Sequence, residues 1–325
     1  MNANLRPMNL GEILDRTLQI YRAKFLLFLG IAAFPALVMM ATNAAVNIWL
    51  TFNPLRGQPL IFHTSLSGLC WSALLFGVGS FLQLLFRPAY VRAVSQTISG
   101  VRISVRDSMT AILRRWKTML AINLFEQFVF VVVPWSVILV AAPALGRYWA
   151  EKTATPITHL VFILTIGVAG IGYLWLGCSF ALSFPTAVLE GTSWLKAVER
   201  SWRLSERNRG RVLFIWLIVV IAGRIADGVS RRSLYSLFRV FGSHWAYLHR
   251  FPIYLVYYSM AYTVVLLLIA PIYPIALTLF YYDQRIRLEG YDIERMMEAA
   301  GLNAPLMPPS EESPIAPGAT QESQA

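Results

Sequence analysis

Residues 104–142 read SVRDSMTAILRRWKTMLAINLFEQFVFVVVPWSVILVAA. The first third of this stretch is basic and amphipathic, because Val105, Met109 and Leu113 recur every four residues among charged side chains. The remainder is a long apolar run that contains one acidic residue, Glu126. A short helix on a membrane surface, followed by a helix that crosses the membrane, explains both parts of the pattern.

The same unit occurs at two other places in the chain. The equivalent apolar rows are Leu10, Leu14 and Leu18 near the start, and Trp194, Val198 and Trp202 in the second half. Each row is followed by a pair of apolar stretches, at a spacing of roughly 90 residues. We therefore predict an all-α, polytopic membrane helical bundle built from three repeated units, each an interfacial helix plus a transmembrane hairpin. The interfacial helices are predicted near residues 9–24, 104–117 and 192–206, with a further one near 285–300.

Composition supports a membrane protein. Hydrophobic residues make up 57% of the chain, charged residues 14%, and the mean hydropathy is +0.55, whereas about a quarter of the residues in soluble chains are charged. A bilayer core about 30 Å thick is crossed by roughly 20 apolar helical residues. About six stretches are predicted to span it: Phe25–Leu50, Leu66–Phe86, Met119–Ala142, Leu160–Phe184, Val212–Gly223 and Ile253–Tyr282.

The distribution of basic residues predicts the orientation. Most of the 28 Lys and Arg residues lie in the amino-terminal segment, in the connectors 87–117 and 196–211, and in the carboxyl-terminal region. Because short basic connectors stay in the cytoplasm, both termini are predicted to be cytoplasmic in a bacterial inner membrane. Residues 1–301 form the predicted membrane domain. Residues 302–325 are polar and contain no Lys or Arg, which predicts a disordered cytoplasmic tail.

The formal net charge of +11 is explained by this topology rather than by a nucleic-acid partner. Basic residues beside membrane spans attract anionic lipid, at about 1 kcal/mol each near the surface. We therefore expect membrane lipids, anionic ones above all, as partners, and a membrane protein partner as a further one. The candidate lipid-surface contacts are Arg106, Arg114, Arg115, Lys117, Arg203 and Arg207.

Three ionisable residues fall at membrane depth and form the candidate polar site: Glu126, Arg224 and Asp227. An unpaired charge there costs at least about 2.5–3.5 kcal/mol. In one interpretation Glu126 pairs with Arg224 across the bundle, and Arg224 also pairs with Asp227 three residues further on. In the other, Arg224 and Asp227 mark the outer interface, and Glu126 is held by Asn123 and Gln127.

No motif in the sequence indicates catalysis. The four histidines lack the spacing of a metal site, and neither a phosphate-binding loop nor a nucleophile motif is present. We therefore expect no catalytic residues, no metal and no cofactor. The expected function is that of a non-catalytic membrane protein that organises lipid or partner proteins. The alternative is a small-solute or lipid transporter that uses the intramembrane charges.

Three segments carry a resemblance to a known family: LRPMNLGEILDRTLQIYRAKF (5–25), FPTAVLEGTSWLKAVERSWRLSERNRGRVLF (184–214) and LTLFYYDQRIRLEGYDIE (277–294). In this order they resemble the bacterial membrane proteins named for the membrane domain of glycerophosphoryl diester phosphodiesterase. The resemblance implies repeated membrane hairpins without an assigned activity. We expect no catalytic barrel, because His249 and Arg250 are followed by Phe251 instead of the glycine of that enzyme's His-Arg-Gly motif and no acidic metal cluster follows. The resemblance therefore implies no phosphodiesterase function.

Overall fold

The computed structural model describes residues 7–52, 66–101, 104–132, 134, 156–240, 252–291, 293 and 296–297. All regular elements in these ranges are helices, which confirms the all-α prediction. Their bounds are α1 (Leu10–Ala23), α2 (Phe25–Phe52), α3 (Leu66–Ile98), α4 (Val105–Arg114), α5 (Trp116–Gln127), the π-helical turn η2 (Phe128–Val132), α7 (Pro156–Phe180), α8 (Ser183–Leu189), α9 (Trp194–Ser205), α10 (Arg209–Val240), α11 (Pro252–Ile269) and α12 (Ile272–Glu289).

Within the described residues, four stretches are long and apolar enough to cross a membrane: Phe25–Thr42, Gly170–Leu189, Arg209–Ser233 and Met260–Glu289. Large apolar side chains on these helices are exposed, for example Leu26, Leu37 and Ile225. A soluble protein would not expose so much apolar surface, so the chain is a membrane protein. The other predicted spans, 66–86 and 119–142, include residues or side chains outside the described set.

Two of the predicted spans are interrupted helices. The span predicted at 160–184 divides where α7 ends at Phe180, and the span predicted at 253–282 divides between α11 and α12. Pro271 lies at the second break, where the missing backbone N–H prevents a continuous helix.

The interfacial helix predicted near 285–300 does not begin at 285, because α12 continues to Glu289 and Gly290 ends it in the left-handed conformation, at φ 65°.

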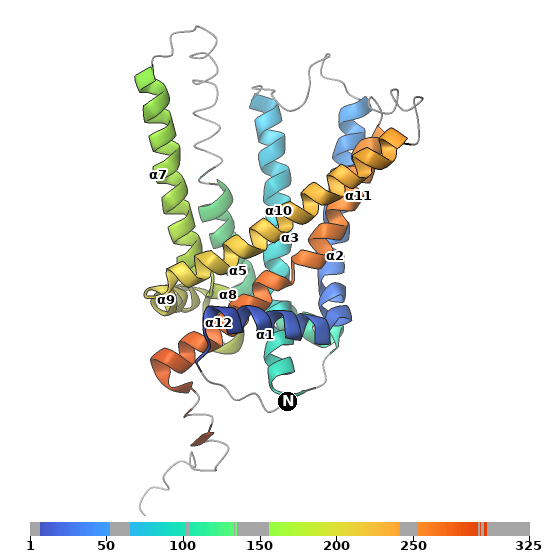
Figure 1. The fold of residues 1–325 in the computed structure, drawn as a ribbon. Coiled ribbons are helices and arrows are strands. Elements are labelled where there is room, and N and C mark those ends of the chain that lie inside the picture. Colours follow the sequence, from blue (N-terminus) through green and yellow to red (C-terminus); the bar gives the residue numbers. More distant parts are fainter. Residues whose placement is uncertain are drawn as a thin grey trace, which may run out of the picture.

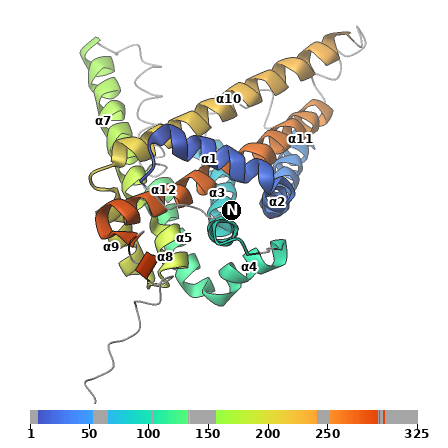
Figure 2. The same ribbon diagram turned by 60° about the horizontal axis from the view of Figure 1, so that its bottom comes forward.

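The amphipathic helices α1, α4 and α9 gather at one end of the bundle (Figures 1 and 2). Two of them begin with a reciprocal cap. The backbone N–H of Glu12 donates to the Asn9 side chain at 2.8 Å, and that of Asp107 donates to the Ser104 hydroxyl at 3.1 Å. Hydrogen bonds from the Ser104 hydroxyl and its backbone N–H also lower the pKa of Asp107. Such caps fix where each helix starts.

The ends of α1 and α4 have the same geometry. Lys24 links α1 to α2 with φ −127° and ψ 35°, and Arg115 links α4 to α5 with φ −130° and ψ 34°. A single non-helical residue thus turns the chain from the amphipathic helix into the long helix that follows. The two connections are nearly identical although their sequences differ.

Each amphipathic helix packs on the bundle through a face beside the predicted row. Ile13, Ser108 and Ala197 stand at equivalent positions, three residues after the first residue of their helices, and each is 0% exposed. Leu18 and Leu113, which belong to the predicted rows, are 43% and 71% exposed. Leu10, Val105 and Met109 of the same rows are partly buried and pack against the core, so the rows lie at the border between the packed face and the exposed face of each helix.

A buried polar cluster around Asp283 joins three parts of the chain at this end. The Asp283 carboxylate is 0% exposed and accepts hydrogen bonds from the backbone N–H of Met8 at 2.7 Å and from Arg211 at 2.8 Å. Arg287 donates to both of its oxygens at 3.0 Å. Both arginines also donate to the Met8 carbonyl, at 2.8 Å each. The cluster holds the segment before α1 against α10 and α12.

Gly191, between α8 and α9, carries a conformational requirement. Its φ is +69°, and a Cβ added there would lie 2.8 Å from Nη2 of Arg115, whose guanidinium donates to the Gly191 carbonyl. We expect Gly191→Ala to lower the free energy of unfolding by about 1–2 kcal/mol, the cost of a left-handed residue with a Cβ. Thermal unfolding in detergent measures this. The matched control is Gly210→Ala in α10, where a Cβ meets nothing within 4 Å; equal effects of the two changes would contradict the requirement.

Candidate functional site

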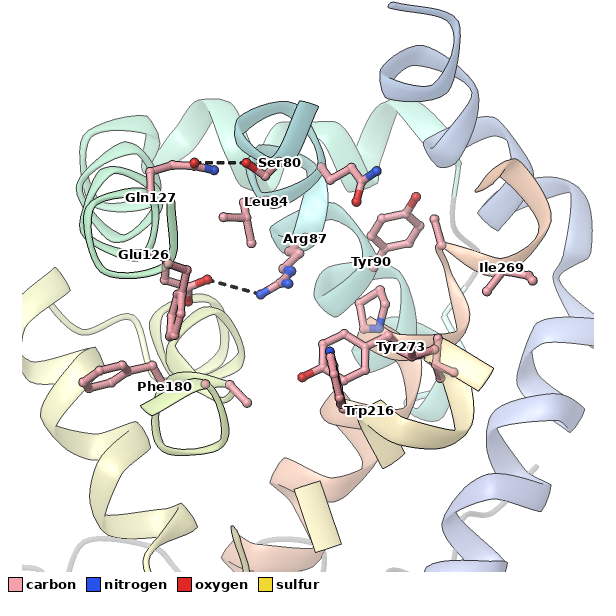
Figure 3. Close-up of a pocket in the computed structure, with 18 of the residues that line it drawn as sticks. Ser80, Leu84, Arg87, Tyr90, Glu126, Gln127, Phe180, Trp216, Ile269 and Tyr273 are labelled. Atoms are coloured by element: carbon pink, nitrogen blue, oxygen red, sulfur yellow. Dashed lines mark hydrogen bonds and ion pairs between the residues drawn. The ribbon is translucent and has the colours of Figure 1, made fainter. Parts of the chain in front are cut away.

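A cavity of about 460 Å³ lies between the long helices. Its walls come from α2, α3, α5, η2, α7, α10, α11 and α12, and most of the lining is apolar. Figure 3 shows the polar exceptions from α3 and α5, with the Phe180, Trp216 and Tyr273 rings among the side chains around them. Pockets that bind small molecules are usually of this size and character.

One ion pair lies in the wall of this cavity. Nη1 of Arg87, on α3, is 3.3 Å from Oε2 of Glu126, on α5. Glu126 is buried, with a side chain 4% exposed, whereas the Arg87 side chain is 26% exposed. Arg87 is therefore only partly buried. Among the described residues, none accepts a hydrogen bond from its other N–H groups.

Aromatic rings support the Arg87 side chain. The guanidinium carbon lies 5.9 Å from the ring centre of Phe184 and 5.7 Å from that of Tyr273. These distances are within the range of cation–π attraction. Figure 3 shows Glu126 on one side of Arg87 and Tyr273 on another, so the ion pair and the ring contacts together hold the guanidinium at the cavity.

Two polar atoms at the Glu126 wall have no hydrogen-bond partner among the described residues. One is Oε1 of Glu126, and the other is Nε2 of Gln127. The Gln127 oxygen, in contrast, accepts from the Ser80 hydroxyl at 3.1 Å. An unmet buried donor or acceptor costs about 1–3 kcal/mol, so a ligand that offered these two atoms a hydrogen bond would be favoured.

Helix irregularities surround the cavity. Pro35 lines it from within α2, and Pro88 follows Arg87 within α3. The π-helical turn η2 begins directly after Gln127, and Ala270 lines the cavity at the break between α11 and α12. π-Helical turns and broken helices are frequent where membrane proteins bind ligands.

The three residues predicted to form a polar site do not come together. Glu126 pairs with Arg87 instead of Arg224, and neither of its predicted neighbours holds it, since Asn123 donates to the Phe81 carbonyl at 2.9 Å. Asp227 accepts from Arg231 at 3.0 Å, one helical turn further along α10. The structure thus pairs Glu126 and Asp227 with Arg87 and Arg231, and not with Arg224.

Arg224 itself is exposed on α10 and does not line the cavity. The reason for the different pairing lies in α3. Although Pro88 is in its sequence, α3 continues as a helix to Ile98, so Arg87 stays inside the bundle and is not the first residue of a connector. The sequence signal that could have indicated this pair was Arg87, at the end of one predicted span, together with Glu126, inside another.

The predicted lipid-surface residues, Arg106, Arg114, Arg115, Lys117, Arg203 and Arg207, are all exposed. Two of them also make contacts within the protein. Arg115 donates to the Gly191 carbonyl, and Arg203 lies 3.4 Å from Glu199. Near them, Leu113 and Trp116 are 71% and 54% exposed. Exposed basic and apolar side chains on one segment suit a membrane surface.

The described part of the chain contains no group of three or more His, Cys, Asp or Glu side chains placed to hold an ion. His63, His244 and His249 lie outside the described residues, and the side chain of His159 is not described. The cavity can instead bind a molecule through one guanidinium, one carboxylate, one amide and a large apolar wall.

Comparisons with known proteins identify a family but no activity. No curated protein and no solved structure matches the chain significantly. A family model described as a domain of unknown function, DUF7847, matches residues 8–281. This range includes the cavity, the Arg87–Glu126 pair and the three amphipathic helices. The chain therefore belongs to the DUF7847 family.

Proposed function

We propose that this chain is a non-catalytic integral membrane protein of the bacterial cytoplasmic membrane that binds and organises lipid. The observation that carries the proposal is the cavity of about 460 Å³, with apolar walls and one charged pair. Lipids are the abundant molecules of a membrane that combine an apolar chain with a polar head group. A lipid-like amphiphile thus matches both parts of the lining.

The amphipathic helices add support from the surface. With both termini cytoplasmic, α1, α4 and α9 lie at the inner face of the membrane, where anionic lipid is attracted by Arg106, Arg114 and their neighbours. The three helices begin at equivalent places, directly after Asn9, Ser104 and Ser193, which supports the three-unit repeat. The matching turns at Lys24 and Arg115 add support for the first two units. They also fit the resemblance to the membrane domain of glycerophosphoryl diester phosphodiesterase.

The test introduces a large side chain into the cavity at Gly177 of α7. This residue lines the cavity, and a Cβ built on it meets only the Phe130 ring, at 3.8 Å, which is ordinary contact. Gly177→Ala should therefore leave lipid binding unchanged, whereas Gly177→Phe should place a ring in the cavity and reduce the lipid retained by at least about tenfold, or about 1.4 kcal/mol. Native mass spectrometry of the purified protein measures this lipid. Equal retention by both variants would refute a lipid site in the cavity.

A transporter of lipid or of a small solute is the second candidate. The helix breaks around the cavity favour it, because interrupted helices form the substrate sites of many transporters. Proteoliposomes containing a fluorescent lipid distinguish the two functions. Movement of lipid between leaflets that is faster than in protein-free vesicles, and that Gly177→Phe abolishes, would favour transport. Binding without movement would favour lipid organisation.

The proposed orientation gives a separate prediction. Single cysteines replace Glu206, which is exposed between α9 and α10, and Arg56, in the first predicted outer connector. In a variant without Cys70 and Cys178, a membrane-impermeant maleimide should label residue 56 in intact cells and residue 206 only after the cells are opened, because basic connectors stay inside. Labelling of residue 206 in intact cells would reverse the topology.

A further inference from the structure

We infer that the cavity recognises the head group of a zwitterionic phospholipid whose ammonium carries N–H groups, with the phosphate on Arg87 and the ammonium on Glu126. The inference rests on the proposed function, since it names the class of lipid that the same cavity takes. It is carried by the charge of the cavity wall, by unmet hydrogen-bonding atoms and by the apolar remainder of the lining.

The charge of the wall selects a ligand without net charge. Arg87 and Glu126 are the charged residues that line the cavity, and they neutralise each other at 3.3 Å. An anionic or cationic ligand would bring a further charge into a site of low dielectric constant without a counter-charge, which is costly. A zwitterion brings none, and its two charges can face the opposite members of the pair.

The hydrogen-bonding atoms match the two ends of such a head group. Arg87 has N–H donors that no described residue fills, and a guanidinium binds phosphate oxygens well. Nε2 of Gln127 is a further unfilled donor, and Oε1 of Glu126 is an unfilled acceptor. Both atoms are shielded from water, but the last torsion of a Glu or Gln side chain is soft. A small rotation brings the Glu126 oxygen to an ammonium and the Gln127 amide to a phosphate.

The rest of the lining suits the start of an acyl chain. Leu174 of α7, Val219 of α10 and Leu266 of α11 are among the apolar side chains that complete the cavity. A volume of about 460 Å³ is in the range of pockets for small molecules. It accommodates the head group and the first part of a chain, while the remainder of the lipid extends along the bundle.

The experiment compares four lipids offered at equal concentration to the full-length protein. Phosphatidylethanolamine has both charges and N–H donors, phosphatidylcholine has both charges without N–H donors, phosphatidylglycerol is anionic, and diacylglycerol has neither charge. Native mass spectrometry should show phosphatidylethanolamine bound at least about tenfold better than each of the others, or about 1.4 kcal/mol. Glu126→Gln should remove the preference over phosphatidylcholine. The control, Glu199→Gln, changes a carboxylate that is 66% exposed on α9 and should leave the preference intact.

A second variant keeps the inference testable if Glu126→Gln destabilises the protein. Arg87→Met combined with Glu126→Gln leaves no unpaired charge, and it should bind the four lipids about equally. Gly177→Phe could displace the lipid while the protein shows no preference among the four lipids, or a preference for phosphatidylglycerol or diacylglycerol. That result would overturn this inference and leave the proposed function standing. Lipid that Gly177→Phe does not displace would overturn the proposed function itself.

Discussion

Replacing Asp283 by Ala should destabilise the protein by about 3 kcal/mol or more, because breaking a buried ion pair leaves uncompensated charge behind. The Asp283 carboxylate accepts from Arg211, Arg287 and the backbone of Met8 while fully buried. The two arginines are 22% and 38% exposed, so water screens part of the loss, and the expected effect stays near the lower end of the usual range. Chemical unfolding in detergent measures the change.

The contacts of the Asp283 cluster also predict a local effect on α1. Because Asp283 and the two arginines hold both the N–H and the carbonyl of Met8, the same substitution should speed hydrogen exchange in α1 more than in α3. The control is Glu199→Gln, which removes an exposed ion pair on α9 and should cost less than about 1 kcal/mol. If Asp283→Ala behaved like this control, the cluster would have no role in stability.

The second large effect concerns the cavity pair. Glu126→Gln and Arg87→Met should each destabilise the protein, since each leaves a charge near the cavity without its partner. The double variant should recover part of the loss, and the coupling energy should lie at about 1–3 kcal/mol, as for residues in contact. A double-mutant cycle by thermal unfolding in nanodiscs gives this value.

Arg224 supplies the matched comparison. One of the two interpretations of the sequence made it the partner of Glu126, but it is exposed on α10 and absent from the cavity lining. A cycle between Glu126→Gln and Arg224→Met should therefore give a coupling near zero, as for independent sites. A coupling to Arg224 that exceeds the coupling to Arg87 would contradict the geometry of the site.

The sequence predicts the helical fold well because its signals are local. Apolar length predicts membrane-spanning helices, and alternating basic and apolar residues predict amphipathic ones. The predicted ranges 9–24, 104–117 and 192–206 contain the observed helices α1, α4 and α9, whose first residues follow Asn9, Ser104 and Ser193. Caps and periodicity both act within a few residues, so a single sequence reveals them.

The pairing of distant residues is not readable in the same way. Arg87 and Glu126 lie 39 residues apart in the sequence, and Asp283 reaches across 275 residues to Met8. Such contacts depend on where α3 and α12 continue or break. Apolar patterning also did not reveal that α3 runs through Pro88, or that α12 extends to Glu289. The candidate polar site was therefore predicted as Glu126, Arg224 and Asp227, and of these three residues Glu126 alone lines the cavity.

The most direct test of a lipid in the cavity is photo-crosslinking in the membrane. A lipid with a photoreactive acyl chain is incorporated into bilayers that contain the full-length protein, and mass spectrometry locates the adducts on α7. Leu174 lines the cavity, whereas Ile171 on the same helix is 70% exposed on the outer surface. We expect adducts at Leu174 that Gly177→Phe removes, together with adducts at Ile171 that it leaves unchanged. Adducts confined to Ile171 and other outward residues would contradict a lipid-binding cavity.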